Sequence, residues 1–271
     1  MGSKKTTKNA HKTHRKKGKG SAVLVAITLC LVCLSVVCAL SFTVLFKANT
    51  ISVQGESIYT DDEIIAASGM AVGKNMLVSI FDGTENRIEK NLPYIANAKI
   101  ERSIDGNVVI KVTAGSVDKS FAMDDKYIYV DADNKVLEIS DAPAADKPVV
   151  KGVALSYKQV GEKMSYIDDT AKQLVYDVFS AAQANGLNVS SISTDEKFSY
   201  VDVMIGDKYL VHLLNTEKID YKLLHIKKSM DSMNSDKTGE FTFSETNEER
   251  VVFTPKEFGN PEQNDGENSI E

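Results

Sequence analysis

The chain has 271 residues and a mass of 29.7 kDa, enough for one large domain or two small ones, and its 42% apolar and 26% charged residues exclude wholesale disorder. Residues 1–20 carry eight Lys or Arg and no acid, so subtracting this +8 from the net charge of −6 leaves −14 on residues 21–271. An acidic body of this kind is a poor ligand for a phosphate backbone, and no nucleic-acid partner is expected.

The first predicted element is one transmembrane helix over residues 21–46. This stretch has no charge, no Pro and no Gly, and as a helix it would be about 39 Å long, more than a hydrocarbon core of about 30 Å. The basic tail (1–20) precedes it and only Lys47 follows closely, so the positive-inside rule predicts a single-pass type II protein with a cytoplasmic N-terminus. A cleaved signal peptide is the alternative, since Val37 and Ala39 suit a cleavage site, but apolar sequence continues past them.

Residues 47–115 are predicted to form a small two-layer module with the order β-α-α-β-β. Thr60-x-x-Glu63 is a capping box, in which each side chain can bond the other residue's backbone at the start of a helix. The expected elements are a strand at 50–54, a helix ending at Ser68-Gly69, a second helix with Ile88, Leu92 and Ile95 on one face, and strands at 100–104 and 108–112.

Residues 116–256 are predicted to form a second, β-rich α+β domain. The expected elements are strands at 127–130 and 135–139, a helix at 170–184, strands at 201–205 and 209–213, a helix carrying Ile219, Leu223, Ile226, Met230 and Met233, and two last strands around Phe241/Phe243 and Val251/Phe253. Residues 257–271 contain five acids and no apolar cluster, which predicts a disordered acidic tail.

Two spaced motifs in the first module are informative together. Ile51-Ser52-Val53-Gln54-Gly55 is followed by the turn Gly73-Lys74-Asn75, and Asn91-Leu92-Pro93-Tyr94-Ile95 leads through Ala98-Lys99-Ile100-Glu101-Arg102 to Val109-Ile110-Lys111-Val112. In these segments the chain resembles the FtsQ/DivIB family of bacterial cell-division proteins, over about residues 1–256 and most strongly over the first 115. The family usually has Pro in the turn where this chain has Asp105-Gly106. The resemblance implies a POTRA module at 47–115 and an FtsQ/DivIB-like domain at 116–256.

The same resemblance implies a function without catalysis. The family is a scaffold of the bacterial divisome, and the implied partners are FtsL-like and DivIC/FtsB-like membrane proteins, bound outside the cell membrane at the division septum. The last strands of the family's second domain accept a partner segment by strand addition, which maps here to Arg250, Val251, Val252, Phe253 and Thr254. The alternative for Val251 and Phe253 is an ordinary role in the core.

Two other functions stay open at this point. One is a different POTRA-bearing membrane protein that handles polypeptides, although such proteins usually repeat the module. The other is a membrane-anchored cell-wall enzyme, because Ser116-x-x-Lys119, Ser232-x-Asn234 and Lys237-Thr238-Gly239 follow the order of penicillin-binding transpeptidases. The last two motifs are only two residues apart, so they cannot form two walls of one cleft, and no enzymatic activity is expected.

No cofactor, metal or small-molecule substrate is expected either. All three cysteines fall within residues 30–38, which removes thiolate chemistry from the exterior part of the chain. His212 and His225 are the two exterior histidines, and no His-Glu-x-x-His motif joins them, so a surface or packing role is expected for both. The basic tail is expected to favour the anionic cytoplasmic leaflet of the cell membrane.

Overall fold

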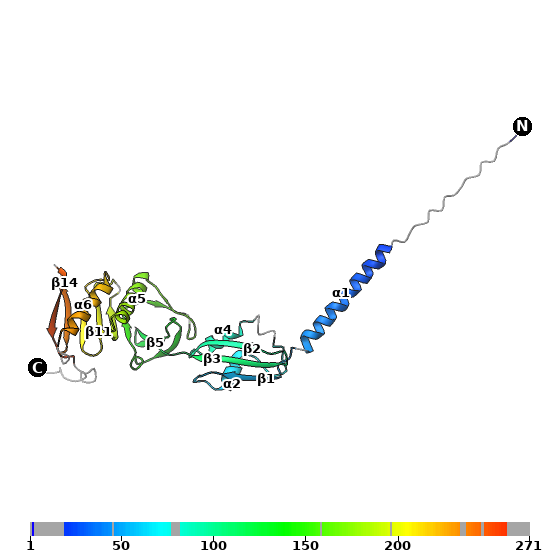
Figure 1. Ribbon diagram of the computed structural model, residues 1–271, viewed down its shortest axis with the longest axis horizontal. Helices are drawn as coiled ribbons and strands as arrows, with labels where there is room; N and C mark the ends of the chain where they lie inside the picture. The colour runs from blue at the N-terminus through cyan, green and yellow to red at the C-terminus, as the bar shows by residue number, and fades with distance from the viewer. Residues whose placement is uncertain are drawn as a thin grey trace.

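The computed structural model describes residues 2, 19–44, 46–76, 82–157, 159–195, 197–233, 237–244 and 247–258. These residues form an α+β protein, as predicted, and Figure 1 shows their arrangement from the N-terminal helix through a small unit to a larger one. The small unit has a three-stranded sheet and the larger unit a nine-stranded sheet with a separate two-stranded ribbon. The predicted basic tail (1–20) and acidic tail (257–271) lie almost wholly outside the described residues.

The N-terminal helix α1 spans Lys19–Val44. Its described aliphatic side chains are half to two thirds exposed, from 51% at Val36 to 68% at Val25, and they occupy neighbouring positions so that every side of the helix is apolar. Within the described residues, however, no helix is both long enough and apolar enough to count as a membrane span. The predicted helix is therefore confirmed as far as Val44, and its crossing of a membrane stays a prediction.

The small unit has the predicted order β-α-α-β-β. Its elements are β1 (Thr50–Gln54), α2 (Asp61–Ser68), α4 (Thr84–Asn91), β2 (Ile95–Arg102) and β3 (Asn107–Ala114). The central strand β3 pairs parallel to β1 and antiparallel to β2, and both helices pack on this sheet through a core that includes Ile64, Ile88 and Ile110. The capping box is confirmed, because Thr60 Oγ1 accepts from the Glu63 amide while the Glu63 carboxylate accepts from the Thr60 amide.

The second helix of the small unit ends earlier than the spacing of Ile88, Leu92 and Ile95 predicts. Only Ile88 lies within α4, whereas Leu92 follows its last turn and Ile95 is the first residue of β2. The reason is Pro93, which lacks an amide hydrogen and disfavours a helical conformation at the residue before it. Leu92 accordingly leaves the helical region, with φ −121° and ψ 82°, and the strand predicted from residue 100 begins five residues sooner.

The larger unit is built on a sheet with the strand order β14-β13-β12-β11-β10-β7-β4-β5-β6. Its elements are β4 (Lys119–Met123), β5 (Lys126–Val130), β6 (Val136–Ser140), β7 (Val149–Lys151), β8 (Leu155–Ser156), β9 (Ser165–Tyr166), α5 (Asp169–Ala184), β10 (Val189–Thr194), β11 (Val201–Ile205), β12 (Tyr209–His212), α6 (Ile219–Asp231), β13 (Gly239–Ser244) and β14 (Asn247–Pro255). The predicted hairpins β5–β6 and β11–β12 and both predicted helices are confirmed, except that α6 ends at Asp231, before the predicted Met233.

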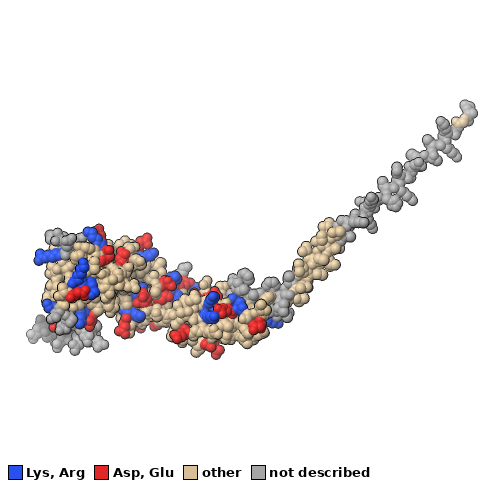
Figure 2. Space-filling view, viewed as in Figure 1, with Lys and Arg blue, Asp and Glu red and all other residues tan. Residues whose placement is uncertain are grey.

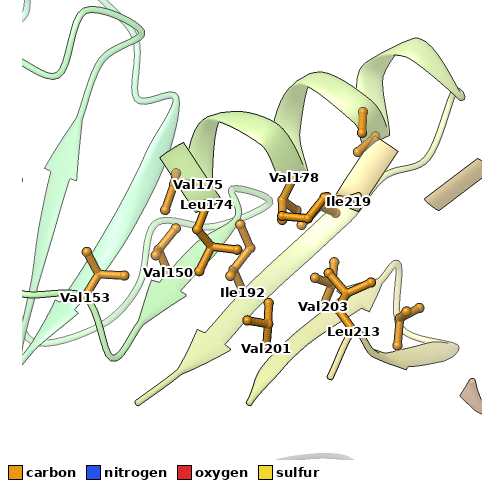
Figure 3. Packing of buried hydrophobic residues seen from close by; sticks show 14 of the residues in the cluster. Val150, Val153, Leu174, Val175, Val178, Ile192, Val201, Val203, Leu213 and Ile219 are labelled. Atoms are coloured by element: carbon orange, nitrogen blue, oxygen red, sulfur yellow. The ribbon is translucent and has the colours of Figure 1, made fainter. Parts of the chain in front are cut away.

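The core of the larger unit lies between the sheet and its two helices. Figure 3 shows Leu174 and Val178 of α5 above Ile192 of β10 and Val203 of β11, with Ile219 of α6 beside them. These residues are all at most 2% exposed. The opposite face of the sheet alternates with more polar side chains, which is the usual pattern when one face is covered and the other faces water.

Several polar contacts cross the junction of the two units, and Lys135 makes the most buried one. Lys90 pairs with Glu162, and the Tyr94 hydroxyl donates to Glu138. Lys135, in the turn between β5 and β6, is 7% exposed, and its Nζ donates to the carbonyl oxygens of Ile95 at 2.6 Å and Glu89 at 3.2 Å. Removal of water at this buried position lowers the pKa of Lys135. Gly161 of the larger unit also approaches the backbone of α4 closely, because an added Cβ would lie 1.9 Å from the carbonyl oxygen of Lys90. Its φ is +87°. The junction is therefore closely packed.

Replacing Lys135 with methionine should lower the stability of the full chain by about 2 kcal/mol, because methionine keeps the length of the side chain but leaves two carbonyl groups without their donor. The measurement is thermal unfolding in detergent. Lys126→Met is the matched control, since Lys126 is an exposed lysine of the same hairpin paired with Asp141, and it should cost less than about 0.5 kcal/mol. Equal effects of the two variants would contradict the role of Lys135.

Candidate functional site

The predicted site residues Arg250–Thr254 all lie on β14, at one edge of the nine-stranded sheet. Within the part of the chain that the structure describes, β14 pairs with β13 alone, antiparallel, with Phe253 opposite Phe241 and Val251 opposite Phe243. The side chains alternate, so that Val251 and Phe253 are partly buried against the core, whereas Arg250, Val252 and Thr254 are exposed on the other face. In Figure 1 β14 is the orange strand at the far end of the molecule from α1.

An aromatic cluster attaches β14 to the rest of the sheet. The ring of Phe253 lies 5.0 Å from that of Phe241 and 6.5 Å from that of Tyr209, measured between centroids. This ring also covers Gly239, where an added Cβ would lie 2.7 Å from it. The core interpretation of Val251 and Phe253 therefore holds for their side chains, while the partner interpretation concerns the backbone of the same residues and stays a prediction.

The direction of the backbone groups follows from one hydrogen bond and the register. The Lys256 amide donates to the carbonyl of Thr238, which makes that pair a hydrogen-bonded one. Because hydrogen-bonded and non-hydrogen-bonded pairs alternate in an antiparallel ladder, the amide and carbonyl groups of Val251 and Phe253 point away from β13, toward the free edge. Pro255 has the same orientation but no amide hydrogen, and it therefore limits the length of the available edge.

Charged side chains hold the end of β14 on the exposed face of the sheet. Lys256 Nζ contacts Glu240 Oε1 at 2.6 Å, and Glu240 lies 3.9 Å from His212 Nε2, whose other ring nitrogen is 2.7 Å from Asp202. The hydrogen bond from Lys256 lowers the pKa of Glu240, because it stabilises the carboxylate form. His212 thus has a polar packing role on the sheet, as expected, and His225 stacks on Tyr221 of α6, with ring centroids 4.2 Å apart.

The attachment of β14 should weaken in acid. Since the folded-state pKa of Glu240 is depressed, its pairing with Lys256 stabilises the fold above the usual glutamate pKa of about 4.3 and is lost as the pH falls through the folded value. Hydrogen exchange of the β14 amides, corrected for intrinsic rates, should therefore accelerate as the pH falls below the folded-state pKa of Glu240. Glu240→Gln should remove this acid-induced acceleration. Glu101→Gln breaks a comparable pair with Lys111 on the small sheet and should leave the response of β14 unchanged. An unchanged response in Glu240→Gln would contradict the assignment.

The motifs of a cell-wall enzyme lie in the wrong secondary structure. Lys119 is the first residue of β4 and Ser116 precedes that strand, so the two do not share a helical turn. Gly239 begins β13, while Asn234 of the second motif is outside the described residues. Among the described residues no group of three or more His, Cys, Asp and Glu side chains is arranged to hold a metal ion.

Sequence reasoning missed the residues that attach the edge strand and order its surroundings. Glu240 and Lys256 are separated by sixteen positions, and the pairing of β13 with β14 is what brings them together. The one sequence signal was Pro255, which marks the end of a strand that can lie at a sheet edge. Nothing in the sequence singled out Lys222, a lysine on α6 that is 1% exposed.

Two comparisons with known proteins find similar sequences. Residues 46–113 match the family model "POTRA domain, FtsQ-type". The chain is also 25% identical over 185 residues to the "Cell division protein FtsQ" of Syntrophotalea carbinolica (strain DSM 2380 / NBRC 103641 / GraBd1), an alignment that covers 64% of this chain and 65% of that protein. The chain thus spans just under two thirds of the length of this relative.

The small β-α-α-β-β unit and its match define a POTRA-domain protein. With the β-rich region that follows, the chain resembles the FtsQ/DivIB family, and its POTRA domain is of the FtsQ type.

Proposed function

We propose that this protein is a non-enzymatic scaffold of the bacterial divisome, which binds partner membrane proteins at the free edge of β14. The observation that carries the proposal is that β14 ends the nine-stranded sheet with the backbone groups of Val251 and Phe253 directed outward. The similarity to a protein described as a cell division protein supports the biological setting.

The proposed scaffold is anchored by α1 in the cell membrane. Residues 21–46 contain no charge, eight basic residues precede them, and the described aliphatic side chains of α1 contact solvent on all sides. A helix that is apolar all round is typical of a buried or membrane environment. In Figure 2 the described surface of α1 carries no charged side chain, whereas the exterior part carries both signs of charge. The N-terminus would lie in the cytoplasm and residues 47–271 outside, at the division septum.

Strand addition explains how such an edge selects a partner. An incoming extended segment satisfies the outward amide of Val251 and the amide and carbonyl of Phe253, which supplies affinity without sequence preference. Selectivity comes from side chains beside the segment, where Arg250 favours an acidic neighbour and Val252, 44% exposed, favours an apolar one. Juxtamembrane segments of FtsL-like and DivIC/FtsB-like proteins are the proposed partners.

The test is photocrosslinking in dividing cells from positions 250, 252 and 254, whose side chains are exposed. Division membrane proteins should be captured from these positions and a fluorescent copy should collect at midcell. The matched control is Tyr176, a 66% exposed position on α5, away from the edge. Capture that is equal from Tyr176 and β14, or absent from both, would refute edge binding. A covalent penicillin probe that labels the protein would instead favour a cell-wall enzyme.

A further inference from the structure

The small unit holds the chain that leaves α1 between two loops. The segment 46–48 lies against the loop at 73–76, since the Ala48 amide donates to the Lys74 carbonyl at 2.9 Å and the Gly73 amide donates to the Ala48 carbonyl at 2.7 Å. On the other side, the Asn49 amide donates to the Gly106 carbonyl at 2.7 Å, and Asn49 Nδ2 donates to the Asp105 carbonyl at the same distance. Ala48 itself is 1% exposed in the core. Both loops are therefore hydrogen-bonded to Ala48 and Asn49, at the end of the segment that joins α1 to this unit, here called the tether.

Each of these loops exposes an aliphatic side chain. Ile104, in the turn between β2 and β3, is 94% exposed, and Val72, beside Gly73, is 65% exposed. A single exposed aliphatic residue is ordinary on a protein surface, but polar residues are the usual occupants of such turns. The lysines Lys47 and Lys74 are exposed at the same end. Two acids lie nearby, and both are already partnered. Asp105 accepts from Asn107 Nδ2 at 2.6 Å, and Asp82, which lines the same cavity as Ala48 and Lys74, pairs with Arg87 at 3.4 Å.

The length of the tether places these loops near the end of α1. Ala48 is four positions after Val44, the last residue of α1, and even a fully extended chain spans only about 14 Å over four positions. The polar layer on each side of a bilayer is roughly 5–8 Å thick. If α1 spans the membrane, the loops that bond Ala48 and Asn49 lie at or just above the lipid headgroups.

We propose that this end of the POTRA domain rests on the outer leaflet of the membrane that α1 crosses, with Ile104 and Val72 inserted among the headgroups and Lys47 and Lys74 facing anionic lipid phosphates. Exposed aliphatic residues flanked by lysines are the combination that binds such an interface. The inference rests on the membrane anchorage proposed above. It gives the exterior domains a fixed orientation over the bilayer rather than free rotation on a linker.

The test uses the absence of tryptophan from the natural sequence. Three single-tryptophan variants of the full chain, Leu34→Trp, Ile104→Trp and Ile58→Trp, are reconstituted in phosphatidylglycerol-containing vesicles with and without brominated acyl chains. Ile58 is the matched control, because it is 72% exposed in the same domain but follows the far end of β1. Ile104→Trp should show blue-shifted emission and lose most of its fluorescence to bromine, as Leu34→Trp does, while Ile58→Trp keeps its emission.

The other outcomes separate this inference from the anchorage. If Leu34→Trp is quenched but Ile104→Trp behaves like Ile58→Trp, the anchor stands and the lipid contact of the POTRA domain is refuted. Equal quenching of Ile104→Trp and Ile58→Trp also refutes it, since the contact would not be specific to this end. If Leu34→Trp escapes quenching, the anchorage fails and the lipid contact fails with it.

Discussion

Proline at position 251 should reduce partner binding at least about tenfold, whereas alanine at the same position should leave most of it intact. The backbone amide of Val251 points away from β13, so proline removes a donor that the sheet does not use and a partner strand would need. The proline ring also occupies space at the edge, where an incoming strand must approach to about 4.8 Å.

The alanine variant separates this backbone effect from the loss of packing. Val251 is partly buried against the core, and both substitutions remove the same contact with it. The measurement is co-purification of partner membrane proteins from cells, together with thermal unfolding of each variant. A proline variant that unfolds like the alanine variant and still retains its partners would exclude strand addition at β14. Equal loss of binding in both variants would assign recognition to the side chain instead.

Replacing Lys222 with methionine should destabilise the protein by about 3 kcal/mol, which corresponds to a Tm lower by roughly 6–12 °C for a domain of this size. Lys222 is 1% exposed, and its Nζ donates to the Leu213 carbonyl at 2.8 Å and to Asn215 Oδ1 at 2.6 Å. These acceptors belong to the loop between β12 and α6, where Leu214 and Lys218 have positive φ angles of 64° and 50°. Such conformations persist only when surrounding contacts hold them, and Lys222 supplies those contacts.

Methionine fills the same space but removes the buried ammonium donor, so that the Leu213 carbonyl is left with the Asn215 amide as its donor and Asn215 Oδ1 is left with the Glu217 amide. The effect is expected to be large because only one side of a buried polar network is removed. Lys228→Met is the control on the same helix, where the lysine is exposed in the last turn and should contribute less than about 1 kcal/mol. Thermal and denaturant unfolding measure both variants. Similar Tm values for the two would show that the loop does not depend on Lys222.

The elements of the small unit were largely predictable because their signals are local. The pairing of Thr60 with Glu63 acts over three residues, and alternation along residues 108–112 reports directly which side chains face the core. The clear error here, the extension of α4 beyond Asn91 to Leu92 and Ile95, came from weighing apolar spacing above Pro93, a single residue that forbids the helix to continue.

In the larger unit, strands β4, β7 and β10 were not predicted. β7 has only three residues and pairs with β4 on one side and β10 on the other, both in parallel. A short buried strand has too few residues to show a period, and its neighbours in the sheet are distant in sequence. The same holds for the parallel pairing of β12 with β13, which depends on the crossover through α6.

For the candidate site, the sequence by itself determined that residues 250–254 can form a strand stopped by Pro255, and that an uncharged stretch at 21–46 follows the basic tail. Only the tertiary structure decided that β14 lies at an edge, with Phe253 packed inward and its backbone directed outward. It also decided that Lys135 and Lys222 are buried, although lysine is usually exposed. The physical reason is that edges and buried cations depend on carbonyl and strand partners far away along the chain, and a local pattern of residues carries no record of them.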